Sequence, residues 1–181
     1  MNLQENIIEI LKKYKELYKE EDIDFLIKFA EENDNSFSRL NKESHFTASG
    51  IVILENKVLL IFHNKLERFL QPGGHIESDD TSLLDAAKRE VEEETGLKVI
   101  PHRNFADLPI HIDIQKIPEN KKKNEPEHYH YDCMFIFETE KDGKVNLQEE
   151  EVSGFQWVDI DYDFEDVGIK KAIEKFKKNF L

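Results

Sequence analysis

The stretch QPGGHIESDDTSLLDAAKREVEEETGL, residues Gln71–Leu97, decides how the rest of the chain is interpreted. It opens with two adjacent glycines and continues into a segment with the apolar spacing of a short helix. Ser82 before Leu83 is typical of a helix N-cap, and Gly96 adopts the left-handed C-cap conformation at little cost. The stretch therefore predicts a glycine-containing loop that leads into a helix from about Leu83 to Gly96.

Three glutamates of this helix share one face. Glu90, Glu93 and Glu94 are spaced at i, i+3 and i+4, and carboxylates that close repel one another unless a cation lies between them. One interpretation is a solvated acidic face, balanced by Lys88 and Arg89. The other is a site for a hard cation, because Mg²⁺ prefers carboxylate oxygens. The glycines upstream allow a ligand close to the backbone, which favours the cation site.

The stretch resembles the Nudix box, G-x5-E-x7-R-E-U-x-E-E-x-G-U, in which U is an aliphatic residue. The second half of the box matches at Arg89, Glu90, Val91, Glu93, Glu94, Gly96 and Leu97. The first half is one residue longer than the pattern. The family's loop glutamate falls on Asp80 when counted from Gly74, and on Thr81 when counted back from Arg89. The sequence leaves open what these two residues do.

The resemblance implies a hydrolase of pyrophosphate bonds that uses Mg²⁺ or Mn²⁺. In the family, the residues that match Glu93 and Glu94 bind metal, and the residue that matches Glu90 binds metal or acts as the base. The carbonyl of Gly74 is implied as a further metal ligand, and Arg89 as the residue that orients the carboxylates. The expected reaction is attack of water on phosphorus in a nucleoside diphosphate linked to another group.

Further candidates lie outside the box. Some Nudix enzymes take their base from the loop before the last strand, where Glu151 is the best match; an acidic loop that contributes only charge is the alternative. Period-two alternation also places polar side chains on shared strand faces, where they are candidates for contacts with substrate. These residues are His111, Asp113, His128, His130 and Asp132. A hydrogen-bonded surface cluster is the alternative, and a zinc site is less favoured because the His-x-His pair lacks a closing set of ligands.

The remaining pattern predicts an α+β protein. Residues 1–44 have helical spacing and predict a two-helix extension, either a cap on the catalytic domain or an arm for a homodimer. Residues 45–181 alternate between strands and helices, which indicates a mixed sheet between helices. The resemblance implies the same α/β/α sandwich for this Nudix domain.

Composition limits the partners. A net charge of −14 over 181 residues disfavours long nucleic acids and anionic membranes, but it is compatible with a small phosphorylated substrate, such as a nucleotide derivative, neutralised by metal. A single cysteine, Cys133, and the lack of a signal-peptide pattern favour the cytoplasm. Two alternatives stay open: a catalytically silent nucleotide-binding sensor and an RNA 5′-end pyrophosphohydrolase.

Overall fold

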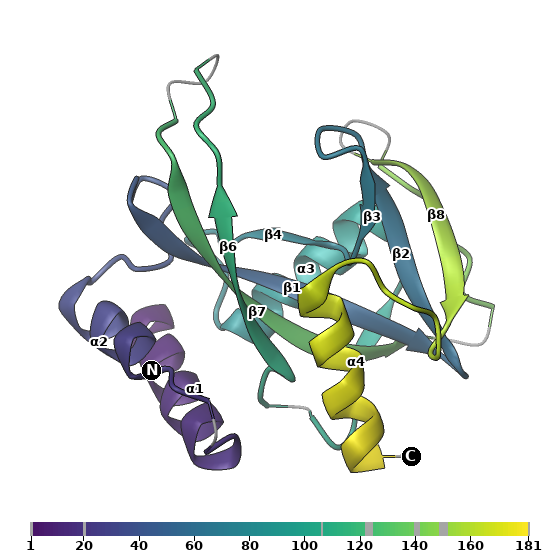
Figure 1. Cartoon of the computed structure of the whole chain (residues 1–181), viewed down its shortest axis with the longest axis horizontal. Coiled ribbons are helices and arrows are strands. Elements are labelled where there is room, and N and C mark those ends of the chain that lie inside the picture. Colours follow the sequence, from purple (N-terminus) through teal and green to yellow (C-terminus); the bar gives the residue numbers. More distant parts are fainter. Residues whose placement is uncertain are drawn as a thin grey trace.

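The computed structural model describes residues 2–19, 21–105, 107–121, 125–139, 142–148 and 152–180 (Figure 1). The helices of this part of the chain are α1 (Leu3–Leu17), α2 (Asp24–Glu32), α3 (Leu83–Thr95) and α4 (Val167–Phe180). The strands are β1 (Ser44–Leu54), β2 (Lys57–His63), β3 (Arg68–Leu70), β4 (Gly73–His75), β5 (Val99–Pro101), β6 (His111–Ile117), β7 (His128–Thr139) and β8 (Val152–Asp159). Two helices precede the first strand, as predicted.

Within the described residues, eight strands form one mixed sheet. β3, β2, β1, β7 and β5 follow one another as hydrogen-bonded neighbours, while β4 pairs with β1, β6 with β7 and β8 with β2. β1 and β7 run parallel over most of their length, with His45 opposite His130 and Thr47 opposite Asp132. This pairing places polar side chains from two distant segments on one sheet face.

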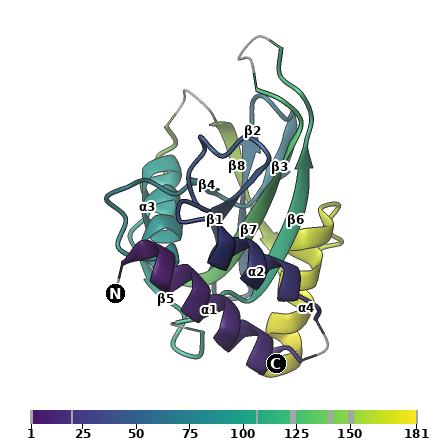
Figure 2. The ribbon, with the colours of Figure 1, turned by 90° about the vertical axis from the view of Figure 1, so that its left-hand side faces the viewer.

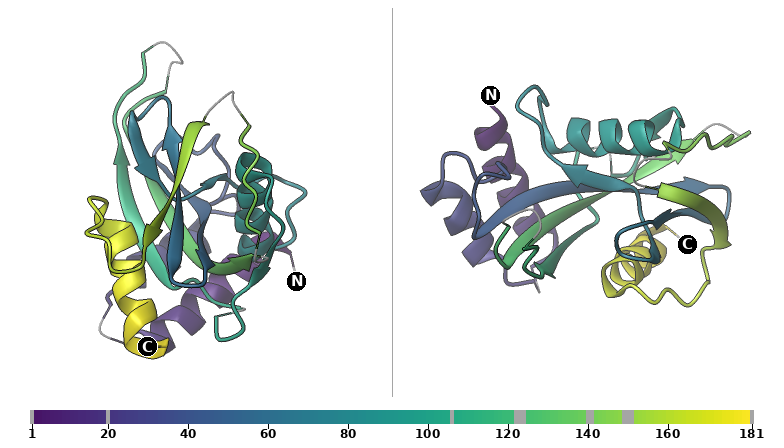
Figure 3. Two further views of the ribbon diagram at one scale, coloured as in Figure 1. Left: turned by 90° about the vertical axis from the view of Figure 1, so that its right-hand side faces the viewer. Right: turned by 90° about the horizontal axis from the view of Figure 1, so that it is seen from above.

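Helices cover both faces of the sheet, and each face has its own hydrophobic core. Side chains of α1, α2 and α3 pack on one face against Phe46 and Phe135. Side chains of α4 pack on the other face against Ile51 and Ile136. Figure 3 shows α3 and α4 on opposite sides of the sheet. Because successive strand residues point to opposite faces, β1 and β7 contribute to both cores. This is the predicted sandwich.

α3 begins and ends at the residues that the sequence indicates. The Ser82 hydroxyl accepts a hydrogen bond from the third amide of the first turn, and Gly96 ends the helix with φ of 66°. A further acceptor comes from the N-terminal extension: the side chain of Asn6 in α1 accepts a hydrogen bond of 3.1 Å from the amide of Leu83. α1 therefore contributes directly to the start of the helix that carries the three glutamates.

The N-terminal helices lie side by side against the sheet (Figure 2). Leu11 and Tyr14 of α1 are fully buried. Lys175 of α4 donates a hydrogen bond of 2.6 Å to the Tyr14 hydroxyl and forms an ion pair of 2.5 Å with Glu21. The extension thus packs on the sheet through apolar side chains and contacts α4 through polar ones.

One segment differs from its predicted structure. The two glycines were predicted to lie in a loop, but Gly73–His75 forms the short strand β4, antiparallel to β1. A Cβ on Gly73 would lie 2.3 Å from the Cβ of Ser49, so only glycine allows the two backbones to approach this closely. Among the described residues, no helix has both the length and the apolar character that crossing a membrane requires.

Candidate active site on the acidic helix

Arg89 is the centre of the acidic face of α3. Its Nε and one terminal nitrogen each donate a hydrogen bond of 2.9 Å to Asp80, one to each carboxylate oxygen. The Asp80 side chain is only 5% exposed. This two-point contact is the strong geometry of an arginine–carboxylate pair. It shows what Asp80 does, which the sequence left open: its carboxylate anchors Arg89.

The same guanidinium lies between two of the three glutamates. One nitrogen of Arg89 donates hydrogen bonds of 2.9 Å to Glu90 and 3.0 Å to Glu93, and another donates one of 3.0 Å to the backbone carbonyl of His75. A cation therefore does separate these carboxylates, and it belongs to the protein. Arg89 also fixes α3 to β4, because the His75 carbonyl is part of that strand.

The third glutamate and the glycines complete the site. A carboxylate oxygen of Glu94 accepts a hydrogen bond of 2.9 Å from the amide of Gly73. A Cβ on Gly74 would lie 2.7 to 2.9 Å from the carboxylate atoms of Glu90. Gly74 therefore leaves the space that the Glu90 carboxylate occupies beside the strand. The result is a set of oxygen donors of the kind that Mg²⁺ and Mn²⁺ bind, on α3 and the adjacent backbone.

The glutamates differ in their environment. Burial raises the pKa of Glu90, Arg89 opposes this effect through its hydrogen bond, and Glu93 and Asp80 add to the rise through their charge. Glu93 is half exposed. The Asp80 hydrogen bonds raise the pKa of Arg89, so this side chain stays charged. The site therefore combines one sheltered carboxylate with one open to solvent.

Asp132 lies on the opposite face of the sheet from α3, in the polar surroundings that alternation along its strand predicted. It is 4% exposed and accepts hydrogen bonds from Ser49 at 2.6 Å, Thr47 at 3.0 Å and Gln71 at 3.2 Å. Burial raises its pKa to about 6, although the hydrogen bonds oppose this shift. Three neutral donors on one carboxylate indicate a polar cluster built around Asp132.

His128 and His130 share that face, as predicted, and their Nε2 atoms lie 3.1 Å apart. Two histidines that sequence reasoning did not single out lie against them. The ring of His45, from β1, lies 4.6 Å from that of His130, and the ring of His75, from β4, lies 5.2 Å from it. The missing signal was the pairing of β1 with β7, which alternation along one strand does not reveal.

His111 and Asp113 face α4 instead. Nδ1 of His111 lies 3.1 Å from Nζ of Lys175, and burial together with that ammonium group lowers the pKa of His111 to about 4. A Cβ on Gly168 would lie 2.8 Å from the Asp113 carboxylate, so the first turn of α4 covers this side chain. The structure therefore brings these two residues to the α4 junction rather than to α3. Glu151 lies outside the described residues.

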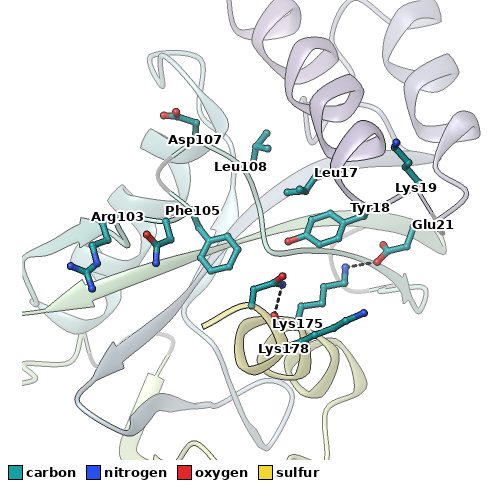
Figure 4. Close-up of a pocket in the computed structure, with 12 residues that line it drawn as sticks. Leu17, Tyr18, Lys19, Glu21, Arg103, Phe105, Asp107, Leu108, Lys175 and Lys178 are labelled. Carbon is teal, nitrogen blue, oxygen red and sulfur yellow. Dashed lines mark hydrogen bonds and ion pairs between the residues drawn. The ribbon is translucent and has the colours of Figure 1, made fainter. Parts of the chain in front are cut away.

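A pocket of about 790 Å³ lies at the junction of α1 and α4, next to residues 103–105, 107 and 108. Tyr18, Glu21 and Lys175 are among its lining residues (Figure 4). None of the three glutamates of the acidic face contributes to it. Its volume would admit a small molecule, but it offers none of the oxygen donors described above.

Comparisons with known proteins give the same picture. A family model described as the NUDIX domain matches residues 44–178. A probable DHNTP pyrophosphohydrolase from Lactococcus lactis subsp. cremoris is 32% identical over 142 residues, which cover 78% of this chain and 75% of that protein. The m7GpppN-mRNA hydrolase NUDT17 of Bos taurus is 30% identical over 99 residues, 51% of this chain and 32% of that protein.

Solved structures share the fold at lower sequence identity. A NUDIX-family hydrolase from Clostridium perfringens superposes with a TM-score of 0.55 at 22% identity, over 75% of this chain and 97% of that one. A C. elegans Ap4A hydrolase superposes with a TM-score of 0.55 at 16% identity, over 74% and 96%. Because the family model covers both α3 and the surrounding sheet, the chain belongs to the Nudix hydrolase family.

Proposed function

We propose that this chain hydrolyses a pyrophosphate bond in a small nucleotide derivative, typically a nucleoside diphosphate linked to another group, and that Mg²⁺ or Mn²⁺ is required. The observation that carries the proposal is the Arg89-centred arrangement of α3. Arg89 orients Glu90 and Glu93, while Glu94 is held by the amide of Gly73. Similarity to the Lactococcus protein named as a DHNTP pyrophosphohydrolase supports the reaction class.

The metal would be held by Glu90, Glu93 and Glu94, with the backbone of Gly74 as a further ligand. When bound, a divalent cation neutralises phosphate charge and lowers the pKa of a coordinated water. The contribution of the chain is to hold the donors in place. Arg89 restrains two of the carboxylates through charged hydrogen bonds, so less order has to be gained when the substrate arrives.

The base that activates water has two candidates. Glu90 lies sheltered beside Gly74, and Glu151 directly precedes Val152 in the sequence. Replacing each with glutamine, at the same length and shape, separates them. We expect the variant of the true base to lose turnover while substrate still binds, because the carboxamide cannot accept the proton.

Asp132 is the candidate for recognition of the substrate's base or sugar. The hydroxyls of Thr47 and Ser49 and the amide of Gln71 donate to it, and such a small cluster of fixed polar groups is what orients a ligand in a binding site. His128 and His130 continue this polar face. DHNTP, the substrate in the name of the Lactococcus relative, is a suitable first substrate, beside nucleotide sugars and dinucleoside polyphosphates.

The test is a substrate panel assayed for phosphorus-containing products with and without Mg²⁺. Glu94→Gln should reduce turnover by about a hundredfold or more, at least the scale of removing one preorganised polar group that stabilises the transition state. Glu92→Gln is the matched control, because Glu92 lies on the same helix but pairs with Lys88 and Lys98. Near-normal turnover of Glu94→Gln would overturn the proposal.

Two other outcomes identify the alternatives. Tight binding of a nucleotide with no product from any substrate would favour a silent sensor. Selective release of pyrophosphate from triphosphorylated RNA would favour an RNA 5′-end hydrolase, although a net charge of −14 opposes binding of long RNA.

A further inference from the structure

Three histidines from two distant segments converge on the sheet face opposite α3. His45 is the second residue of β1, and His128 and His130 are the first and third residues of the parallel strand β7. One ring nitrogen from each lies within 4.8 Å of the other two. Among the described residues, no other three histidine, cysteine or acidic side chains bring their donor atoms this close. The sequence showed the His-x-His pair, and the structure adds the third histidine that closes the set.

Backbone carbonyl oxygens determine which ring nitrogen is protonated in His45 and in His128. Nδ1 of His45 lies 3.1 Å from the carbonyl oxygen of Asn41, and Nδ1 of His128 lies 2.8 Å from that of Pro126. A carbonyl oxygen can only accept, so each Nδ1 donates and each Nε2 of the neutral ring has a free lone pair. A histidine that donates through Nδ1 to a carbonyl is the usual form of a metal-binding histidine.

The Nε2 atoms of the three rings cannot all serve as hydrogen-bond partners for one another. Nε2 of His128 faces Nε2 of His130 at 3.1 Å, and one hydrogen bond between them would need His130 to donate. Nε2 of His45 remains buried and has no hydrogen-bond partner in the described part of the chain, in a side chain that is 2% exposed. A buried acceptor without a partner is costly and is rarely retained without a reason. An electron-pair acceptor at the centre of the three rings would supply the missing partner.

Burial favours the neutral form of His45 and His130. Burial and the neighbouring histidines His45, His75 and His128 lower the pKa of His130 to about 3. Burial, together with His128, lowers the pKa of His45, which the contact with the Asn41 carbonyl opposes. Neutral imidazoles are the ligands of borderline transition metals rather than of Mg²⁺.

We propose that His45, His128 and His130 bind a transition-metal ion, best matched by Zn²⁺, through their Nε2 atoms, at a site separate from the glutamates of α3. The spacing is suitable: tetrahedral zinc with Zn–N bonds of about 2.0 to 2.1 Å separates two nitrogens by about 3.3 Å, close to the 3.1 Å between His128 and His130. His75, whose ring lies 5.2 Å from that of His45, adjoins the fourth position. The proposal does not depend on the function proposed above.

The experiment uses the full chain, stripped of metal with a chelator and then titrated with Zn²⁺ in the presence of excess Mg²⁺, which fills oxygen sites. We expect one equivalent to bind and the melting temperature to rise, because a ligand specific for the folded state stabilises it. His45→Gln and His130→Gln should each weaken the Zn²⁺ affinity by about a hundredfold. Losing a residue that only hydrogen-bonds to a metal ligand costs about 10- to 100-fold in affinity, so losing a ligand itself should cost at least the upper value.

Two controls separate this site from others. His102→Gln should leave affinity unchanged, because His102 packs against Phe105 and Phe176, away from the three rings. Glu94→Gln should also leave the affinity unchanged, since Glu94 lies on α3.

If a histidine variant does not fold, the visible spectrum of the Co²⁺-loaded parent chain decides. Bands of a four-coordinate, nitrogen-rich centre support the site, and those of a six-coordinate oxygen centre refute it.

The proposal is overturned if no stoichiometric Zn²⁺ binds to the parent chain while Mg²⁺ is present. It is also overturned if Zn²⁺ binding survives in both histidine variants, or if it is lost in Glu94→Gln while the histidines are intact.

Discussion

Replacing Arg89 should destabilise the fold, independently of any effect on catalysis. The side chain makes five hydrogen bonds of 2.9 to 3.0 Å, two of them to Asp80. In Arg89→Ala, the Asp80 carboxylate, which is 5% exposed in the intact chain, would lose its arginine partner and keep only the hydrogen bond from the Glu77 amide. Breaking a buried ion pair costs about 3 to 5 kcal/mol. Because Arg89 is itself a quarter exposed, water can partly replace it, and we expect about 3 kcal/mol, the low end of that range.

The measurement is equilibrium unfolding in urea at neutral pH, with a chelator present so that metal binding does not contribute. A loss of about 3 kcal/mol should also lower the melting temperature by about 6 to 12 °C for a chain of this size. Arg89→Lys keeps the charge but loses the two-point contact, so about half of the loss is expected. Lys88→Ala, whose pair with Glu92 is 4.0 Å long and on the surface, should change stability by less than about 0.5 kcal/mol.

A double-mutant cycle with Asp80→Ala completes the test. Because the two side chains contact each other directly, their effects should be non-additive by about 1.5 kcal/mol or more. The reasoning fails if Arg89→Ala is as stable as Lys88→Ala, or if the effects of the two substitutions simply add.

Three further predictions concern other parts of the molecule. Gly74→Ala should lower activity and Mg²⁺ affinity while the chain stays folded, because the new Cβ would displace the Glu90 carboxylate; isothermal titration and turnover assays check this, and unchanged values for both would contradict it. Leu11→Ala should cost about 2 to 5 kcal/mol in denaturant unfolding, since this side chain is fully buried against the sheet, whereas the exposed Leu17→Ala should cost far less. Burial alone would raise the pKa of Glu21, but hydrogen bonds from the lysine of α4 and the tyrosine of α1 hold it below its usual value. Its contribution to stability is therefore complete above the unfolded value of about 4.3 and lost as the pH falls through the folded value, so Glu21→Gln should flatten the acid limb of the unfolding free energy; an unchanged slope would refute this.

The predictions that proved reliable rest on local signals. Ser82 and Gly96 define the ends of α3 because N-cap hydrogen bonding and left-handed backbone geometry depend on only a few neighbouring residues. The spacing of Glu90 and Glu93 placed both within reach of Arg89 for the same reason. These features require no knowledge of which strand pairs with which.

The features that the sequence could not reveal depend on pairing between distant strands. His45 faces His130 only because β1 and β7 run parallel in one register, and a shift of one residue would send either ring to the opposite face. Asp80 is comparable: motif counting placed the loop glutamate there or at Thr81, and only the three-dimensional position of Arg89 distinguishes the two. The roles of the site residues in catalysis remain predictions.

The hydrogen bond from the amide of Leu83 to Asn6 has a practical consequence for anyone who shortens this protein. The part that matches the family begins at residue 44, so a truncation designed by homology would discard Asn6. The first turn of α3 would then lose one of its two side-chain acceptors and keep only Ser82, so the helix that carries the three glutamates should fray more readily at its start. The start of the family match and the start of the segment that stabilises α3 need not coincide, and here they differ by some forty residues.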